Sequence, residues 1–338
     1  MMEYLFVLGR DKDLALLELE SVFSFENVKK AKGGFAVVDT GEKPAIERFG
    51  GITKIGKRIN DLNEIVIGKD KLSYSVFGDK EIRLMMKKRF KEERVKGMFR
   101  AFSYEPGNVD IEIVSFDGKL FLIEGVSKPK EYRLRDELRP RFDAKKVISI
   151  RMAKMLINFS KAEKEIFDPF CGGGTILQEG LLRGLDVIGI DRSVNDARKN
   201  LNWLRKGFSI KNNFKLIEGD ARELSKYVNG VECVVTEPYM GPYFRKLPSV
   251  GKGKRVIRSL AEMYDRVFGE LGKIVAGRVV MIIPAIRTYK NILEMDFMEI
   301  ASRHGFKLVK SGFVKMPVEY NMPKAKVLRE IWVLEKLK

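Results

Sequence analysis

Three aspartates stand at the ends of short apolar segments in the second half of the chain. Asp168 ends EIFD, Asp191 ends DVIGID and Asp220 follows FKLIEG. Apolar runs of this length without alternation predict strands that are buried on both faces, and parallel sheets bind ligands at the carboxyl ends of their strands. A helix N-cap would explain any one of these acids. Three acids at consecutive strand ends predict one shared ligand site.

A glycine-rich turn, DPFCGGGTILQEG (168–180), connects the first of these strands to a helix that begins at Thr175. Glycines let the backbone approach a ligand closely, and the helix N-terminus offers free N–H groups. No Lys follows the glycines, which excludes a phosphate loop of the GxxxxGK[ST] type, and the spacing also departs from GxGxxG. Asp168 therefore favours a ligand with a cationic end. Asp191 is placed to accept hydrogen bonds from two ribose hydroxyls, and Asp220 from an adenine amino group.

These segments resemble S-adenosylmethionine-dependent methyltransferases over residues 142–338, and DPFCGGGT is similar to the form found in RNA guanine-N2 methyltransferases. The resemblance implies S-adenosylmethionine as the cofactor and no metal. The cofactor-binding residues that it implies are Asp168, Phe170, Gly172, Gly174, Thr175, Asp191, Asp220 and Ala221.

A second motif of that family, D/N-P-P-Y/F, corresponds to Thr236-Glu237-Pro238-Tyr239 in this chain. An exocyclic amine conjugated with its ring is a poor nucleophile, so the site must accept hydrogen bonds from its N–H groups and hold the base flat. A carbonyl fixed by Pro238 and a polar side chain can accept these bonds, while Tyr239 stacks on the base. Thr236 or Glu237 must serve where the family has Asp or Asn. Thr cannot take a proton and Glu can, and the sequence leaves the acceptor open.

The elements that must position these motifs alternate between helices and apolar strands after Phe142, beginning with a helix expected at 144–159. This alternation predicts an α/β fold with a doubly wound, mostly parallel sheet. The resemblance implies that this sheet belongs to a Rossmann-like seven-stranded methyltransferase domain over 144–338. Before it, alternating strands, helices and a hairpin that turns at Asp117-Gly118 predict an α+β region.

The first half of the chain resembles the THUMP-domain-containing tRNA guanine-N2 methyltransferases, among them the archaeal tRNA guanine-10 enzymes and their paralogues. The resemblance lies in LGRDKDLALLELESV, FGGITKIGKRI and RPRFDAKKVISIRMAKMLIN. It implies a ferredoxin-like segment at 1–60 and a THUMP-like RNA-binding domain at 61–126. Residues 127–143, rich in charge and with two prolines, are expected to form a linker.

Basic residues exceed acidic ones by 18, with 64 Lys+Arg against 46 Asp+Glu. Most of the excess lies after Arg141, where the chain has 36 basic and 22 acidic residues, against 28 and 24 up to and including Arg141. Such a charge predicts a polyanionic partner. The stretch 238–261 has no acid, and its glycines predict a mobile loop that binds this partner. Its basic residues are Arg245, Lys246, Lys252, Lys254, Arg255 and Arg258.

With two cysteines and one histidine, the chain shows no known zinc-binding spacing, and neither metal nor Ser-His-Asp chemistry is expected. No apolar run reaches membrane-spanning length and no signal peptide is visible, so a cytoplasmic protein is expected. Abundant Lys, Arg and Glu with a single Gln are typical of heat-adapted proteins. The expected function is methylation of a guanosine N2 amine in tRNA by a monomer. The alternatives are methylation of adenine N6 or cytosine N4 in rRNA or DNA, and an RNA-binding relative without catalysis.

Overall fold

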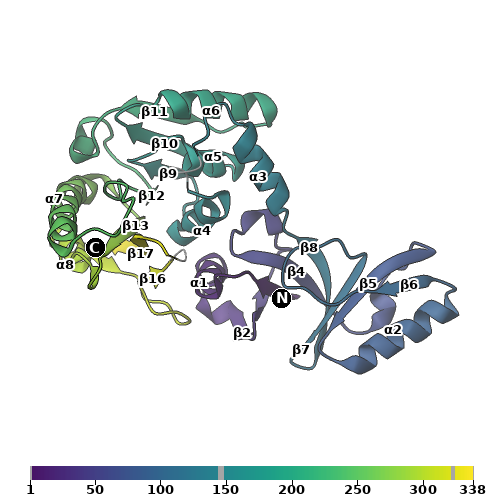
Figure 1. Ribbon diagram of the computed structural model, residues 1–338. Coiled ribbons are helices and arrows are strands. Elements are labelled where there is room, and N and C mark those ends of the chain that lie inside the picture. Colours follow the sequence, from purple (N-terminus) through teal and green to yellow (C-terminus); the bar gives the residue numbers. More distant parts are fainter. Residues whose placement is uncertain (1, 144–147, 321–323, 338) are drawn as a thin grey trace. The chain divides into compact units, whose positions relative to one another are not determined.

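The computed structural model describes residues 2–143, 148–320 and 324–337 (Figure 1). The chain forms two compact units, Met1–Glu131 and Tyr132–Lys338, which are described separately. Within the described ranges, no helix combines the length and apolar character needed to cross a bilayer.

The first unit is built on one eight-stranded sheet with the order β2-β3-β1-β4-β8-β7-β5-β6. Its helices are α1 (Lys12–Phe23) and α2 (Lys80–Glu92). Its strands are β1 (Met2–Leu8), β2 (Val28–Lys32), β3 (Phe35–Thr40), β4 (Ile52–Ile59), β5 (Lys71–Phe77), β6 (Lys96–Phe99), β7 (Ile111–Phe116) and β8 (Lys119–Val126).

This sheet runs without a break across the border expected at residue 60. Strand β4, from the segment 1–60, pairs antiparallel with β8, from the segment 61–126. The reason is the hairpin at Asp117-Gly118, where Asp117 adopts a φ of 54° and returns β8 against β4. The two segments therefore share one sheet.

The second unit has a doubly wound sheet whose main path is β11-β10-β9-β12-β13-β17-β15. The first five strands of this path are parallel, and β17 and β15 are antiparallel to their neighbours. This confirms the expected Rossmann-like seven-stranded architecture, which follows the α+β region along the chain. The strands are β9 (Glu165–Asp168), β10 (Asp186–Asp191), β11 (Phe214–Glu218), β12 (Cys233–Thr236), β13 (Arg278–Arg287), β15 (Phe306–Leu308) and β17 (Val327–Lys336), with short β14 (Ile292–Leu293) and β16 (Val318–Glu319) added at β13 and β17.

Helices cover both faces of this sheet (Figure 1). One layer contains α4 (Ile150–Ser160), α5 (Thr175–Leu182) and α6 (Asn195–Gly207), and the other contains α7 (Val250–Ile274) and α8 (Phe297–Arg303). The second layer buries a core in which Tyr264 and Phe268 of α7 pack with Phe297 of α8 and strand residues such as Phe167. Burial of these rings fixes α7 against this face of the sheet.

Two segments differ in detail from what the sequence predicts. The expected linker contains a helix, α3 (Pro129–Leu138), which begins with a proline at a position where helices tolerate it. The helix expected at 144–159 corresponds to α4, which begins at Ile150 and ends at Ser160, and residues 144–147 lie outside the described residues.

The basic stretch 238–261 is also not a loop throughout, because α7 begins at Val250. The Ser249 hydroxyl accepts a hydrogen bond from the N–H of Lys252, 3.3 Å away, and so caps the helix. Gly253 serves close packing instead of a turn, since a Cβ there would lie 2.7 Å from Leu293 Cδ1. All four basic residues of this stretch after Ser249, namely Lys252, Lys254, Arg255 and Arg258, therefore lie on a helix.

Candidate functional site

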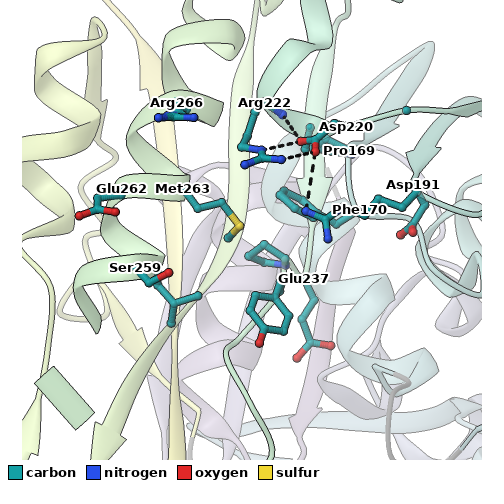
Figure 2. Close-up of a pocket in the computed structure, with 16 residues that line it drawn as sticks. Pro169, Phe170, Asp191, Asp220, Arg222, Glu237, Ser259, Glu262, Met263 and Arg266 are labelled. Atoms are coloured by element: carbon teal, nitrogen blue, oxygen red, sulfur yellow. Dashed lines mark hydrogen bonds and ion pairs between the residues drawn. The ribbon is translucent and has the colours of Figure 1, made fainter. Parts of the chain in front are cut away.

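A cavity of about 790 Å³ opens at the carboxyl ends of the parallel strands (Figure 2). The strand ends supply one wall and α7 supplies the other. Its lining comprises Pro169, Phe170, Asp191, Arg192, Gly219, Asp220, Ala221, Arg222, Glu237, Pro238, Tyr239, Ser259, Leu260, Glu262, Met263 and Arg266. The parallel topology thus brings together residues that are 97 positions apart in the sequence, from Pro169 to Arg266.

The glycine turn after β9 is held against the end of β10. The N–H of Gly172 donates to Asp191 Oδ2 at 2.9 Å, which orients a carboxylate that lines the cavity. Gly172 and Gly174 have φ values of 47° and 81°, in the left-handed region that favours glycine. A Cβ on Gly172 would meet no atom within 4 Å, so this side of the turn is open space.

Asp168 lies beneath the cavity and does not line it. Its side chain is buried, the residue being 2% exposed, and its Oδ1 accepts hydrogen bonds from the Thr236 hydroxyl at 2.6 Å and the Phe170 N–H at 3.0 Å. Burial raises the pKa of Asp168 to about 7. In this structure, its contacts connect the ends of β9 and β12, and Thr236, itself 0% exposed, directs its hydroxyl toward Asp168.

Asp220, at the end of the third parallel strand in sequence, lines the cavity together with Arg222 (Figure 2). The guanidinium of Arg222 donates from Nε and Nη2 to the two carboxylate oxygens at 2.9 and 2.6 Å, and its backbone N–H donates at 2.9 Å. These hydrogen bonds hold the pKa of Asp220 well below its usual range. Asp220 is therefore an anionic acceptor whose oxygens are hydrogen-bonded to Arg222, while Arg192 Nη2 lies 3.7 Å from its Oδ2.

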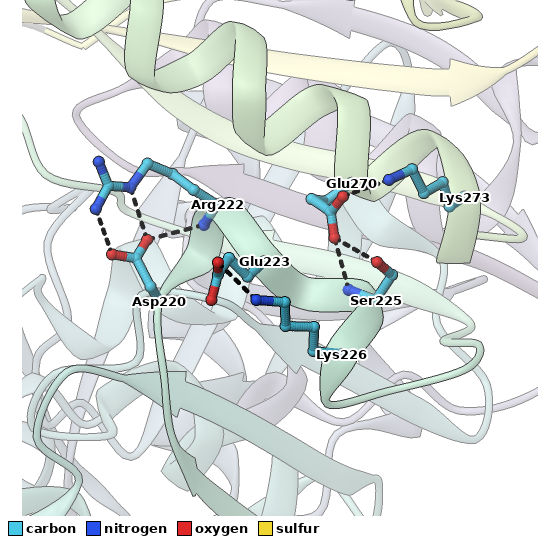
Figure 3. A network of polar contacts seen from close by, with 7 residues as sticks. All are labelled: Asp220, Arg222, Glu223, Ser225, Lys226, Glu270 and Lys273. Atoms are coloured by element: carbon cyan, nitrogen blue, oxygen red, sulfur yellow. Dashed lines mark hydrogen bonds and ion pairs between the residues drawn. The ribbon is translucent and has the colours of Figure 1, made fainter.

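Polar contacts join the 3-10 segment η4 (Ala221–Lys226) to α7 (Figure 3). The N–H and hydroxyl of Ser225 donate to Glu270 Oε2 at 2.8 and 2.6 Å, and Lys273 pairs with the same carboxylate. Two walls of the cavity, η4 and α7, are thus held at a fixed separation.

The segment Thr236–Tyr239 begins at the last residue of β12, and its last three residues line the cavity. Arg329 Nε of β17 binds Glu237 Oε1 at 3.0 Å and so holds this carboxylate at the cavity wall. The buried hydroxyl of Tyr264 donates to the carbonyl oxygen of Tyr239 at 2.8 Å. The ring of Tyr239, in a residue that is 55% exposed, is available for stacking.

The structure brings most of the predicted site residues together. Those lining the cavity are Phe170, Asp191, Asp220, Ala221, Glu237, Pro238 and Tyr239, while Asp168, Gly172, Gly174, Thr175 and Thr236 support it from outside the lining. Sequence reasoning missed the contribution of α7, namely Ser259, Glu262, Met263 and Arg266. Their i, i+3, i+4, i+7 spacing is the signal that could have identified one face of a helix.

Residues 139–313 match the UPF0020 family, described as RMKL-like, methyltransferase domain. The chain is 28% identical over 185 residues to the tRNA (guanine(10)-N2)-dimethyltransferase of Pyrococcus abyssi, covering 53% of this chain and 49% of that protein. It is 30% identical over 192 residues to the enzyme of the same name from Methanothermobacter thermautotrophicus, covering 55% and 52%. The chain thus spans about half the length of the curated relatives it matches.

The fold is also similar to a solved structure over its whole length. The crystal structure of TrmN from Thermus thermophilus matches 99% of this chain and 100% of that chain, with a TM-score of 0.50 and 15% identity. This likeness supports the two-part fold.

Proposed function

Because the chain belongs to the UPF0020 family of RMKL-like methyltransferase domains, we propose that it methylates the exocyclic N2 amine of a guanosine in tRNA. S-adenosylmethionine is the proposed methyl donor. The observation that carries the proposal is the cavity, in which two strand-end acids and the segment Glu237-Pro238-Tyr239 face the same space.

The carboxylates and apolar side chains that line the cavity fit the proposed cofactor. Asp191 and Asp220 supply carboxylate acceptors for the ribose hydroxyls and the adenine amine, and Ala221 and Phe170 supply apolar surface beside them. The open space at Gly172 leaves room for close approach to the backbone. When bound, S-adenosylmethionine supplies an electrophilic methyl group whose leaving group is a neutral thioether. Positioning of the amine then matters more than acid–base strength.

Glu237 is the proposed acceptor of the amine, in preference to Thr236. The Thr236 hydroxyl is buried against Asp168, whereas the Glu237 carboxylate lines the cavity. A carboxylate accepts a hydrogen bond from the amine N–H and so draws the lone pair of the amine nitrogen out of conjugation with the ring. One of its oxygens can then take the proton that the amine releases. We expect Glu237→Gln to lower methyl transfer by about 100-fold or more, because the neutral amide loses both the ion pair with Arg329 that positions the side chain and the strong charged acceptor for the amine N–H. Thr236→Ser, which keeps the hydroxyl, should retain transfer within about threefold, and an equal loss in both variants would contradict this assignment.

The proposed tRNA partner rests on the names of the relatives and on the charge around the cavity. Arg222 and Arg266 line the cavity, and exposed Lys252, Arg255 and Arg258 lie on the first turns of α7. Exposed Lys and Arg at this spacing can neutralise phosphates that flank an extruded nucleotide. The first unit, with its basic helix α2, is proposed as the THUMP-like RNA-binding part.

One observation favours a second candidate, an RNA-binding relative without catalysis. Thr236 stands where the family motif has Asp or Asn, and its hydroxyl is engaged by Asp168 at 2.6 Å. Cofactor binding separates the two candidates, because only a methyltransferase needs the donor. Calorimetry with S-adenosylhomocysteine should give saturable heat under the main proposal and none under the second.

The main proposal is tested by methyl transfer from labelled S-adenosylmethionine to three unmodified substrates: tRNA transcripts, rRNA and DNA. Label in tRNA alone supports the proposal. Label in DNA or rRNA would favour methylation of adenine N6 or cytosine N4, and the absence of label from all three would reject a methyltransferase.

A further inference from the structure

A buried arginine with unused hydrogen-bond donors lies beside the glycine turn. The side chain of Arg139, just after α3, is 0% exposed. Its Nη1 donates to the Thr175 hydroxyl at 2.7 Å, while Nε and Nη2 have no hydrogen-bond partner within the described residues. Buried donors of a charged group that remain unpaired are strongly unfavourable.

The location makes the positive charge still less favourable. Thr175 is the first residue of α5, so the guanidinium lies at the end of the helix that carries the positive pole of its dipole. The nearest acid, Asp136, lies 3.7 Å away by its Oδ1, and that oxygen also lacks a hydrogen bond. Burial lowers the pKa of Arg139 and raises that of Asp136. A cation, a helix N-terminus and two guanidinium nitrogens with unused N–H donors together form a site for an anion.

This site is joined to the proposed cofactor cavity by direct contacts. Asn200 of α6 donates from Nδ2 to the carbonyls of Gly173 and Arg141, each at 2.9 Å, and accepts from the Arg141 N–H at 2.9 Å. The segment that carries Arg139 is therefore fixed to the glycine turn. On the other side of the same turn, Gly172 binds Asp191, which lines the cavity.

We propose that Arg139 binds the carboxylate of the amino-acid end of the methyl donor, across the glycine turn from Asp191. This inference rests on the proposed function. A carboxylate matches the planar guanidinium, which can donate from two nitrogens at once. A phosphate of a nucleic acid is too bulky to reach a fully buried side chain. The ring of Phe142 is centred 5.1 Å from the guanidinium carbon, in a residue that is 42% exposed, and the proposal requires this ring to turn outward when the ligand binds.

The test compares two probes by calorimetry on the full chain without RNA. The first is S-adenosylhomocysteine and the second is its decarboxylated analogue, which keeps the adenosine, the sulfur and the amine. We expect the wild-type protein to prefer the first by about 10- to 100-fold, as hydrogen bonds between charged groups provide. Arg139→Met should reduce this preference to within about threefold. Arg135→Met is the matched control, since it removes a neighbouring, partly buried arginine of α3 that binds Glu179, and it should keep the preference.

Arg139→Lys keeps the protein testable if the Met variant does not fold, which thermal unfolding will show. A lysine keeps the positive charge but lacks the two parallel N–H donors of the guanidinium. The preference for S-adenosylhomocysteine over its decarboxylated analogue should therefore fall by at least about threefold. An unchanged preference in the folded Arg139 variants would overturn the assignment while leaving the proposed function intact. Failure of the wild-type protein to bind either probe would overturn both the proposed function and this inference.

Discussion

Asp168 should make the stability of this protein depend on pH in a direction opposite to that of most acids. Burial raises its pKa from 3.8 to about 7. Between these values the folded chain holds a proton that the unfolded chain has lost, so the free energy of unfolding falls as pH rises through this range. The difference between 3.8 and about 7 corresponds to at most about 4 kcal/mol.

Asp168→Asn should remove this dependence, because an amide is neutral at every pH and its oxygen still accepts from Thr236 and Phe170. We expect urea unfolding to give a variant that is similar to the wild type at pH 4 and more stable by up to about 4 kcal/mol at pH 8. Asp220→Asn is the control. Its carboxylate has a lowered pKa, so its stability contribution is present above about pH 4 and lost as pH falls. Parallel pH profiles for the wild type and Asp168→Asn would refute the reasoning.

Two other predictions concern the cavity and its surroundings. Tyr264→Phe removes only the hydrogen bond to the Tyr239 carbonyl, so we expect kcat/KM for tRNA to fall about tenfold while the affinity for S-adenosylhomocysteine stays within about twofold. Equal losses in both would show a general structural role. Replacing Arg255 and Arg258 by Gln should lower the slope of log affinity for tRNA against log salt by about two, as measured by filter binding, and an unchanged slope would place the phosphate contacts elsewhere.

The strand-end acids could be predicted from the sequence because their positions depend on topology alone. Once the apolar runs are assigned to parallel strands, Asp191 and Asp220 must lie at one edge of the sheet. The direction of a side chain is harder to predict, since alternate residues of a strand point to opposite faces. A shift of one residue in the expected end of β12 decides whether Thr236 or Glu237 faces the cavity, and the motif alone did not settle this.

The extent of α7 and the surroundings of Arg139 could not be predicted for a related reason. Gly251 and Gly253 lower local helix propensity, but packing of the following turns against the sheet and the Ser249 cap outweigh that preference. The position of Arg139 depends on Asn200, more than 50 residues later, which binds the backbone of Arg141. Contacts at such separations leave no periodic signal in a single sequence.

The most direct test of the proposed function is the identity of the methylated nucleoside. Unmodified tRNA is incubated with the protein and S-adenosylmethionine, digested to nucleosides and analysed by mass spectrometry, with Glu237→Gln as the matched inactive variant. The proposal predicts guanosine methylated on N2 with the wild-type protein and a loss of about 100-fold or more with the variant. Methylation of any other nucleoside, or none with a protein that binds S-adenosylhomocysteine, would contradict it.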